Sequence, residues 1–228
     1  MNRLRIGPMA LALIAVFAMS LAASATASAA LPELVNKEGK EVVKKKFTGK
    51  ASGTSTFETK SGEAVKCTGS TTKGEVTGLK TQSVENKFTG CSAVSGLLKC
   101  KTKSAAAGEI VLKVNAKVVY LSESAKTVGI DLALPETLTI ECTGLLSETL
   151  KVKGSTPCPT TTALSKKSTL TCKETKGKQE FTEYEEGGVK VKDITETEGS
   201  GTKKFAFEES GLTSTNELEF EEEVEIKH

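Results

Sequence analysis

Apolar and polar residues alternate in short runs along most of the chain. Side chains at every second position lie on one face of a β-strand, so this period predicts half-buried strands. Gly-, Ser- and Thr-rich stretches separate the runs, and none shows the 3.6-residue period of a helix. We therefore predict an all-β fold. The clearest runs cover residues 65–67, 110–114, 128–134, 138–142 and 150–152, with a turn expected at Asn115-Ala116 before an apolar pair at 118 and 120.

The C-terminal part of the chain shows the same period. Phe181 and Tyr184 precede Gly187-Gly188, and Val189 and Val191 follow, which predicts a hairpin with a glycine turn. In the last run one face is apolar and the other carries five glutamates, so a half-buried strand is favoured over a helix. The apolar positions are Leu218, Phe220, Val224 and Ile226; the glutamates are Glu217, Glu219, Glu221, Glu223 and Glu225.

The first thirty residues follow a different pattern. Arg3 and Arg5 precede an apolar run over residues 9–21, and a small-residue stretch ends in Ala27-Ser28-Ala29. This is the layout of a secretory signal peptide, with an apolar helix and an A-x-A cleavage signal. We expect cleavage at Ala29 or Ala30. The predicted organisation is a signal peptide over 1–30 and one β domain over 31–228, with the acidic segment 180–228 packed on the same core. No later run reaches the roughly 20 apolar residues of a membrane span, so no membrane anchor is expected after cleavage.

All six cysteines lie after this leader, which predicts disulfides formed in an oxidising compartment. Fifteen pairings are available to six cysteines. Proximity along the chain favours Cys91 with Cys100 and Cys158 with Cys172, which leaves Cys67 with Cys142. Metal binding is the rival interpretation, but it needs closely spaced ligands such as C-x-x-C. The chain has none and its only histidine is His228, so no metal or other cofactor is predicted.

Charge is distributed unevenly. Without Arg3 and Arg5 the chain has 29 basic and 29 acidic residues; residues 31–179 carry 24 and 14 of them, and residues 180–228 carry 5 and 15. A nucleic-acid surface is not predicted, because the lysines are scattered through strand patterns, arginine is nearly absent and aromatics are 4%. We expect instead that the acidic end packs against the basic part.

Candidate catalytic residues are scarce. His228 is terminal, so a Ser-His-Asp or Cys-His arrangement lacks a positioned imidazole. Glycosidases need two carboxyl groups across a cleft, yet none of Glu109, Glu123, Asp131 and Glu141 is distinguished by its context. The absence of tryptophan also removes the usual platform for sugar stacking. We therefore predict no catalytic, cofactor-binding or metal-binding residue.

Several short motifs lie between Phe57 and Ile226. They are Phe88-Thr89-Gly90-Cys91, Cys100, Gly108-Glu109-Ile110, residues 128–132, Cys142 and Glu225-Ile226. This set of motifs resembles uncharacterised secreted proteins of soil actinobacteria. The Cys158/Cys172 pair looks like an addition to that pattern. The resemblance implies export and a single β domain, and it implies no activity or site residue.

Taken together, the sequence predicts an antiparallel β-sandwich or flattened barrel held by three disulfides. The favoured function is that of an exported, non-enzymatic structural or binding protein, extracellular or surface-associated, whose partner is an extracellular macromolecule or a small ligand. One alternative is a small-ligand or polysaccharide-binding module, which a deep apolar cavity would favour. The other is a secreted hydrolase, which two carboxylates about 5–10 Å apart across a cleft would favour.

Overall fold

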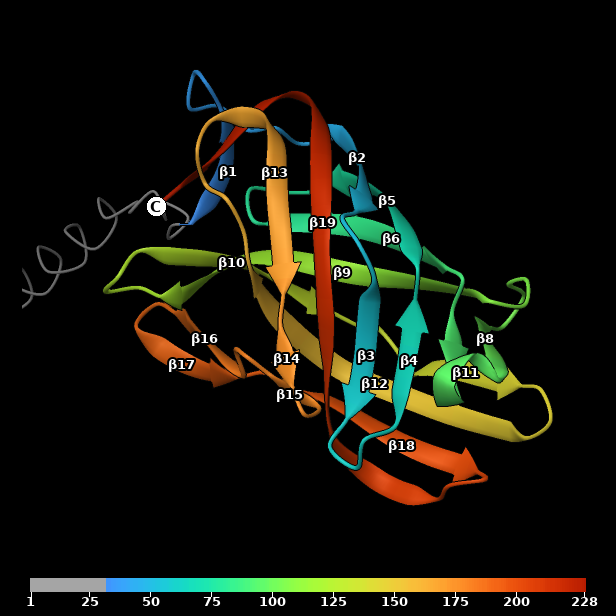
Figure 1. The fold of residues 1–228 in the computed structure, drawn as a ribbon. Helices are drawn as coiled ribbons and strands as arrows, with labels where there is room; N and C mark the ends of the chain where they lie inside the picture. The colour runs from blue at the N-terminus through green and yellow to red at the C-terminus, as the bar shows by residue number, and fades with distance from the viewer. Residues whose placement is uncertain (1–31) are drawn as a thin grey trace, which may run out of the picture. The chain divides into compact units, whose positions relative to one another are not determined.

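The computed structural model describes residues 32–228, and β-strands dominate them (Figure 1). Seventeen strands are hydrogen-bonded into one continuous sheet, and every strand pairing in it is antiparallel. The predicted all-β, disulfide-linked fold is confirmed. The predicted signal peptide and its cleavage positions, Ala29 and Ala30, lie outside the described residues.

Eight strands of the sheet close into a ring, which we call the first barrel. The final contact is a bridge between Thr160 and Leu170, beside which the Thr160 hydroxyl donates to the Thr169 carbonyl. In hydrogen-bonding order the ring contains β2 (Lys46–Ala51), β5 (Gly69–Val76), β6 (Thr81–Thr89), β9 (Glu109–Ser122), β10 (Thr127–Ala133), β12 (Ser147–Pro159), β13 (Ser165–Cys172) and β19 (Phe205–Lys227).

A second barrel forms from the other halves of β12 and β19 together with six shorter strands. This ring contains β3 (Ser55–Thr59), β4 (Ala64–Cys67), β7 (Ser92–Ala93), β8 (Leu98–Thr102), β11 (Leu138–Thr143), β12, β18 (Thr195–Gly201) and β19. A single turn of 3-10 helix, η1 (Val94–Gly96), joins β7 to β8. The pairings thus form two closed rings, whereas the sequence predicted one sandwich or flattened barrel.

The remaining strands extend this framework. β1 (Glu33–Asn36) pairs with the last residues of β19. β16 (Glu183–Glu186) and β17 (Val189–Lys192) form the predicted hairpin, which lies against β9. Gly187 and Gly188 have φ angles of 59° and 77°, the left-handed conformation that a tight hairpin turn requires. A small separate hairpin pairs β14 (Glu174–Thr175) with β15 (Lys178–Gln179).

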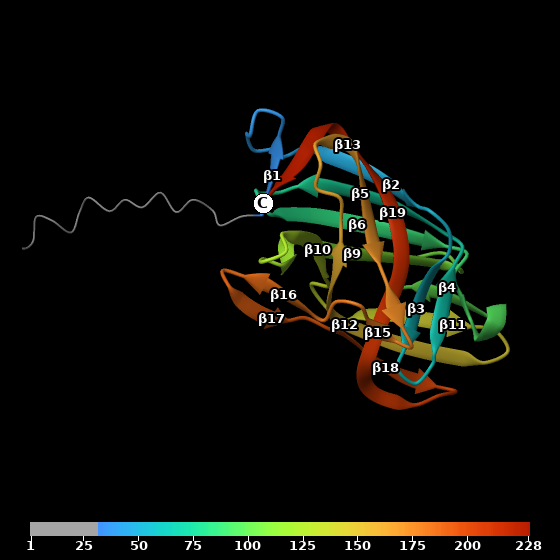
Figure 2. The same ribbon diagram turned by 60° about the vertical axis from the view of Figure 1, so that its left-hand side comes forward.

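The two long strands, β12 and β19, pass through both barrels (Figures 1 and 2). Residues up to Gly154 of β12 pair in the second barrel, and residues from Ser155 pair in the first. β19 likewise pairs with β18 and β3 up to Thr213 and with β13 and β2 from Ser214 onward. Each barrel has its own hydrophobic core, and Leu112 and Leu134 pack against both.

One predicted turn is wrong. β9 runs without interruption through Asn115-Ala116. Ala116 keeps the period of the inward face, so it is buried in line with Val114 and Val118. A small residue in an alternating run thus continues the strand here.

The acidic C-terminal run is a strand, as its alternation predicts. Leu218, Phe220, Val224 and Ile226 are all buried in the core of the first barrel. The expected attraction between the acidic end and the basic part is also present as ion pairs. These include Lys45–Glu222 at 3.5 Å, Lys117–Glu186 at 2.7 Å and Lys151–Glu198 at 2.9 Å.

The structure forms the predicted Cys158–Cys172 disulfide, but the other two predicted pairings are wrong. Cys67 is bonded to Cys91 and Cys100 to Cys142. Pairing of Gly69 with Thr89 brings the end of β4 beside Cys91, and the β8–β11 register sets Cys100 directly opposite Cys142. Strand pairing, which brings together residues distant in sequence, therefore overrides proximity along the chain. The three disulfides indicate an oxidising, extracellular-type environment.

Candidate functional site

Four turns of the second barrel open at the same end and surround a cleft of about 610 Å³. Antiparallel neighbours joined by short connections place successive turns together, and here they are the β3–β4, β7–β8, β11–β12 and β18–β19 turns. They lie toward the lower right of Figure 1. We call this cleft the barrel mouth. Barrel mouths are among the preferred locations of ligand sites.

Two glutamates form the floor of the mouth. Glu63 continues the inward row of Val65 and Cys67 by one period, and Glu148 does the same for Leu150 and Val152. The two residues are only 8% and 4% exposed. Each is therefore the last member of a row that otherwise faces the core, which explains why two carboxyl groups are buried at the end of a barrel.

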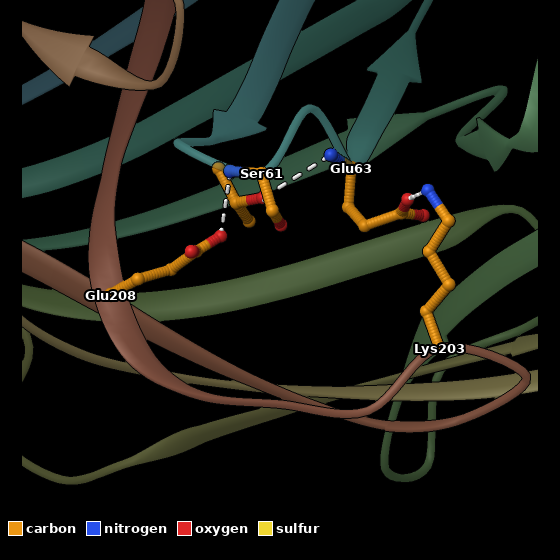
Figure 3. Close-up of polar contacts among 5 residues, drawn as sticks. Ser61, Glu63, Lys203 and Glu208 are labelled. Atoms are coloured by element: carbon orange, nitrogen blue, oxygen red, sulfur yellow. Dashed lines mark hydrogen bonds and ion pairs between the residues drawn. The ribbon is translucent and has the colours of Figure 1, made fainter.

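Lys203, on the β18–β19 turn, supplies the positive charge. Its ammonium forms an ion pair with Glu63, and its side chain is 62% exposed (Figure 3). The pairing raises the pKa of Lys203. Burial raises the pKa of Glu148, and the charge and hydrogen bonding of Glu63 raise it further, against the opposing effect of Lys203. The floor thus combines a Glu63 carboxyl group paired with the Lys203 ammonium and a second carboxyl group, Glu148, whose pKa is raised.

The β3–β4 turn that carries Glu63 is held by a polar network (Figure 3). The Glu63 amide donates to the Thr59 hydroxyl at 3.2 Å, and the Ser61 amide donates to the Glu208 carboxylate at 2.8 Å. Burial alone would raise the pKa of Glu208, but hydrogen bonds from Ser61 and Thr59 outweigh it and lower that pKa. The turn is therefore anchored to β19, which fixes Glu63 opposite Lys203.

The rim of the mouth is aliphatic. Val94 and Leu146 line it and are exposed. Leu145, next to Leu146 in sequence, and Leu97, three residues after Val94, are exposed as well. Val94 and Ser95 adopt positive φ angles of 49° and 53°. Such a backbone is unfavourable for side chains other than glycine and is concentrated at functional sites. The mouth therefore presents an apolar rim above a charged floor.

Within the described residues, one oxygen on the floor has no partner. Glu148 Oε1 is buried without a hydrogen bond. Unpaired buried polar atoms are costly and uncommon in folded proteins. This atom is therefore available to a ligand group that enters the mouth.

A second carboxyl pair lies away from the mouth, under the β16–β17 hairpin. Asp131 of β10 and Asp193, just after β17, are both buried and lie close enough for each carboxyl group to affect the pKa of the other. Burial and the neighbouring Asp193 raise the pKa of Asp131 to about 8, against an opposing effect of Lys117. The Ser155 hydroxyl donates to Asp193. The pair ties the hairpin to the barrel and lines no part of the mouth.

The other carboxylates considered from the sequence do not come together. Glu109 forms an ion pair with Lys87 at 2.8 Å, Glu123 accepts from the Gly188 amide at 3.1 Å, and Glu141 is exposed on β11. The His228 ring contacts the Ile226 carbonyl. Sequence reasoning missed Glu63, Glu148 and Asp193. The first two could have been found by extending the alternation of 65–67 and 150–152 backward by two residues.

Glu63 lies close enough to Glu148 for its charge to raise the pKa of that carboxyl group. Glycosidases, by comparison, place two carboxyl groups on either side of the scissile bond. Among residues 32–228, no three His, Cys, Asp or Glu side chains gather as a metal site. In the same part of the chain, no helix has the length and apolar character needed to cross a membrane.

Comparisons with protein-family models, curated proteins and solved structures find no match to this chain. The function must therefore be argued from the geometry of the mouth.

Proposed function

We propose that this is an exported, non-enzymatic binding protein and that the mouth of the second barrel takes a small amphiphilic molecule with a cationic amine head. The observation that carries the proposal is the buried Glu63–Glu148 pair beneath an aliphatic rim. Export rests on the basic, apolar and small-residue segments of the first thirty residues and on the three disulfides.

The charges of the floor favour a cationic head. Both glutamates of the floor are buried, whereas the two lysines that line the cleft, Lys66 and Lys203, are exposed, and only Lys203 forms an ion pair with the floor, from a side chain on a turn. The Lys203 ammonium thus occupies the position that the amine of a ligand would take. An entering ammonium that replaces it would contact Glu63 and supply a donor to the unpaired Glu148 oxygen.

The rim favours an aliphatic tail over a sugar. The large apolar side chains exposed there are valine and leucine, which bury methylene groups well. Sugar sites commonly use an aromatic platform, and the chain has no tryptophan. A short alkyl chain attached to the amine fits this rim.

The test uses hexylammonium and hexanoate, which share an alkyl tail and differ in head charge, in calorimetric titrations of the mature protein. Hexylammonium should bind and hexanoate should not. Glu63→Gln should weaken hexylammonium binding by at least about tenfold, since a charge-assisted hydrogen bond contributes roughly 1.5–3 kcal/mol and about 1.4 kcal/mol corresponds to a factor of ten. Lys203→Ala should tighten it by removing the internal competitor.

Glu223→Gln is the matched control, because Glu223 is an exposed carboxylate on β19 away from the mouth. It should leave binding unchanged. Preferential binding of hexanoate, with loss of that binding in Lys203→Ala, would show that the mouth is an anion site. No binding of either probe would reject the small-ligand proposal.

A further inference from the structure

Two cavities lie inside the barrels, away from the mouth. One, of about 110 Å³, is located where the two cores meet; the other, of about 60 Å³, lies within the first barrel. Five residues line both: Phe88, Leu112, Val114, Leu132 and Leu212. The cavities are therefore neighbours separated only by side chains.

The walls of the larger cavity are apolar. Val65 and Ile140 come from the core of the second barrel, and Val114 comes from that of the first. An apolar cavity of about 150 Å³ in another protein stays dry and binds benzene. The volume here is thus suited to a molecule of about that size, particularly if Leu112 or Leu132 moves toward the smaller cavity.

One polar group in the wall is unsatisfied. Thr156 is 6% exposed, and within residues 32–228 its hydroxyl has no hydrogen-bond partner. The other hydroxyls in this wall are paired: Thr195 donates to the Ser155 carbonyl at 3.0 Å, and Ser55 contacts Ser214 at 2.9 Å. A single polar atom in an apolar surrounding does not hold a water well, because a buried water needs two to four partners.

We infer that the cavity is a second binding site, distinct from the mouth, for a small and mostly apolar molecule with one hydrogen-bonding group. The Thr156 hydroxyl pairs with that group, and the surrounding aliphatic side chains contact the apolar body. A phenol has this chemistry. Ligand pockets of this kind combine a hydrophobic lining with few convergent polar groups.

The test titrates the mature protein with phenol and with toluene, which match in shape and differ in the hydroxyl. The readout is the methyl NMR resonances of valine and leucine. Both probes should shift Val114 and Leu132. Thr156→Val preserves shape and removes the hydroxyl, so phenol affinity should fall about tenfold while toluene affinity stays the same. Thr175→Val, at an exposed threonine on β14, is the control and should change neither.

Variants that fill the cavity provide an independent test of the site. Val114→Leu should abolish binding of both probes; Val152→Ile, also in the cavity wall, serves if that variant does not fold. Glu63→Gln should leave phenol binding unchanged, which separates this site from the mouth. Absence of shifts with either probe, or binding that survives in a folded cavity-filled variant, would overturn the inference. Equal phenol affinity in Thr156→Val would overturn the role of Thr156.

Discussion

Phe220 provides the sharpest test of how the fold is stabilised. It is 6% exposed and lies opposite Phe47 in the β19–β2 register, with ring centroids 4.9 Å apart and ring planes inclined by 39°. Both rings belong to the core of the first barrel. Truncation of Phe220 to alanine removes a buried ring and leaves a cavity that surrounding strands cannot fill without breaking their pairing.

The expected cost follows from this environment. Phe→Ala at a buried site lowers the free energy of unfolding by about 3–5 kcal/mol, of which about 0.5–1.5 kcal/mol is the aromatic pair itself. For a domain of this size that corresponds to a fall in Tm of roughly 6–20 °C. Salt bridges on the outer face of β19 contribute only about 0–1 kcal/mol each, so burial should dominate.

The assay is urea unfolding of the oxidised protein, with the midpoint and slope recorded for each variant. Glu223→Gln, on the exposed face of the same strand, should stay within about 0.5 kcal/mol of the parent. A double-mutant cycle with Phe47→Ala isolates the ring–ring contribution. A loss below about 1 kcal/mol in Phe220→Ala, no larger than that of the control, would show that β19 does not stabilise the first barrel through its buried face.

Three further predictions test other parts of the structure. Peptide mapping of the unreduced protein should recover Cys67 with Cys91 and Cys100 with Cys142; recovery of Cys91 with Cys100 would contradict the strand register. Removal of the Cys100–Cys142 bond should lower the free energy of unfolding by about 4 kcal/mol, and removal of Cys158–Cys172 by about 3 kcal/mol, in the chain-entropy model. The first bond closes the longer loop, with a sequence separation of 42 compared with 14 for the second. Asp131 has a pKa of about 8 in the folded protein and an ordinary carboxyl pKa in the unfolded chain. As pH rises from about 4 to 8, the unfolded state therefore loses this proton before the folded state does. The free energy of unfolding should fall over that pH range. Asp131→Asn, which mimics the protonated form, should flatten that dependence and be more stable than the parent at pH 8; an unchanged urea midpoint profile would refute the assignment.

Alternation allowed much of the fold to be predicted, because a period of two encodes both the strand and its buried face. The buried row of β19 and the Gly187-Gly188 hairpin are examples. The closure of two barrels could not be predicted in this way, since it depends on which strands pair. β2 pairs with β19, more than 160 residues later, and no local pattern specifies that partner.

The candidate site was harder to predict for the same reason. Glu63 and Glu148 are 85 positions apart, and only the closed second barrel brings them together. Each occupies an inward-facing position, for which the sequence indicates that the side chain is buried but not which residue lies beside it. The wrong disulfides have the same origin, since Cys100 meets Cys142 through the β8–β11 register.

The position of β19 has a consequence for biosynthesis. This final strand pairs with β1, β2, β3, β13 and β18, so it closes both rings at once. Neither ring can close before β19 has been made, because the earlier strands leave a gap that this strand fills. The Cys67–Cys91 and Cys100–Cys142 bonds join segments made much earlier and can constrain a partly formed second barrel before β19 is added. Formation of these two bonds and closure of the rings are therefore separate events in the folding of the chain.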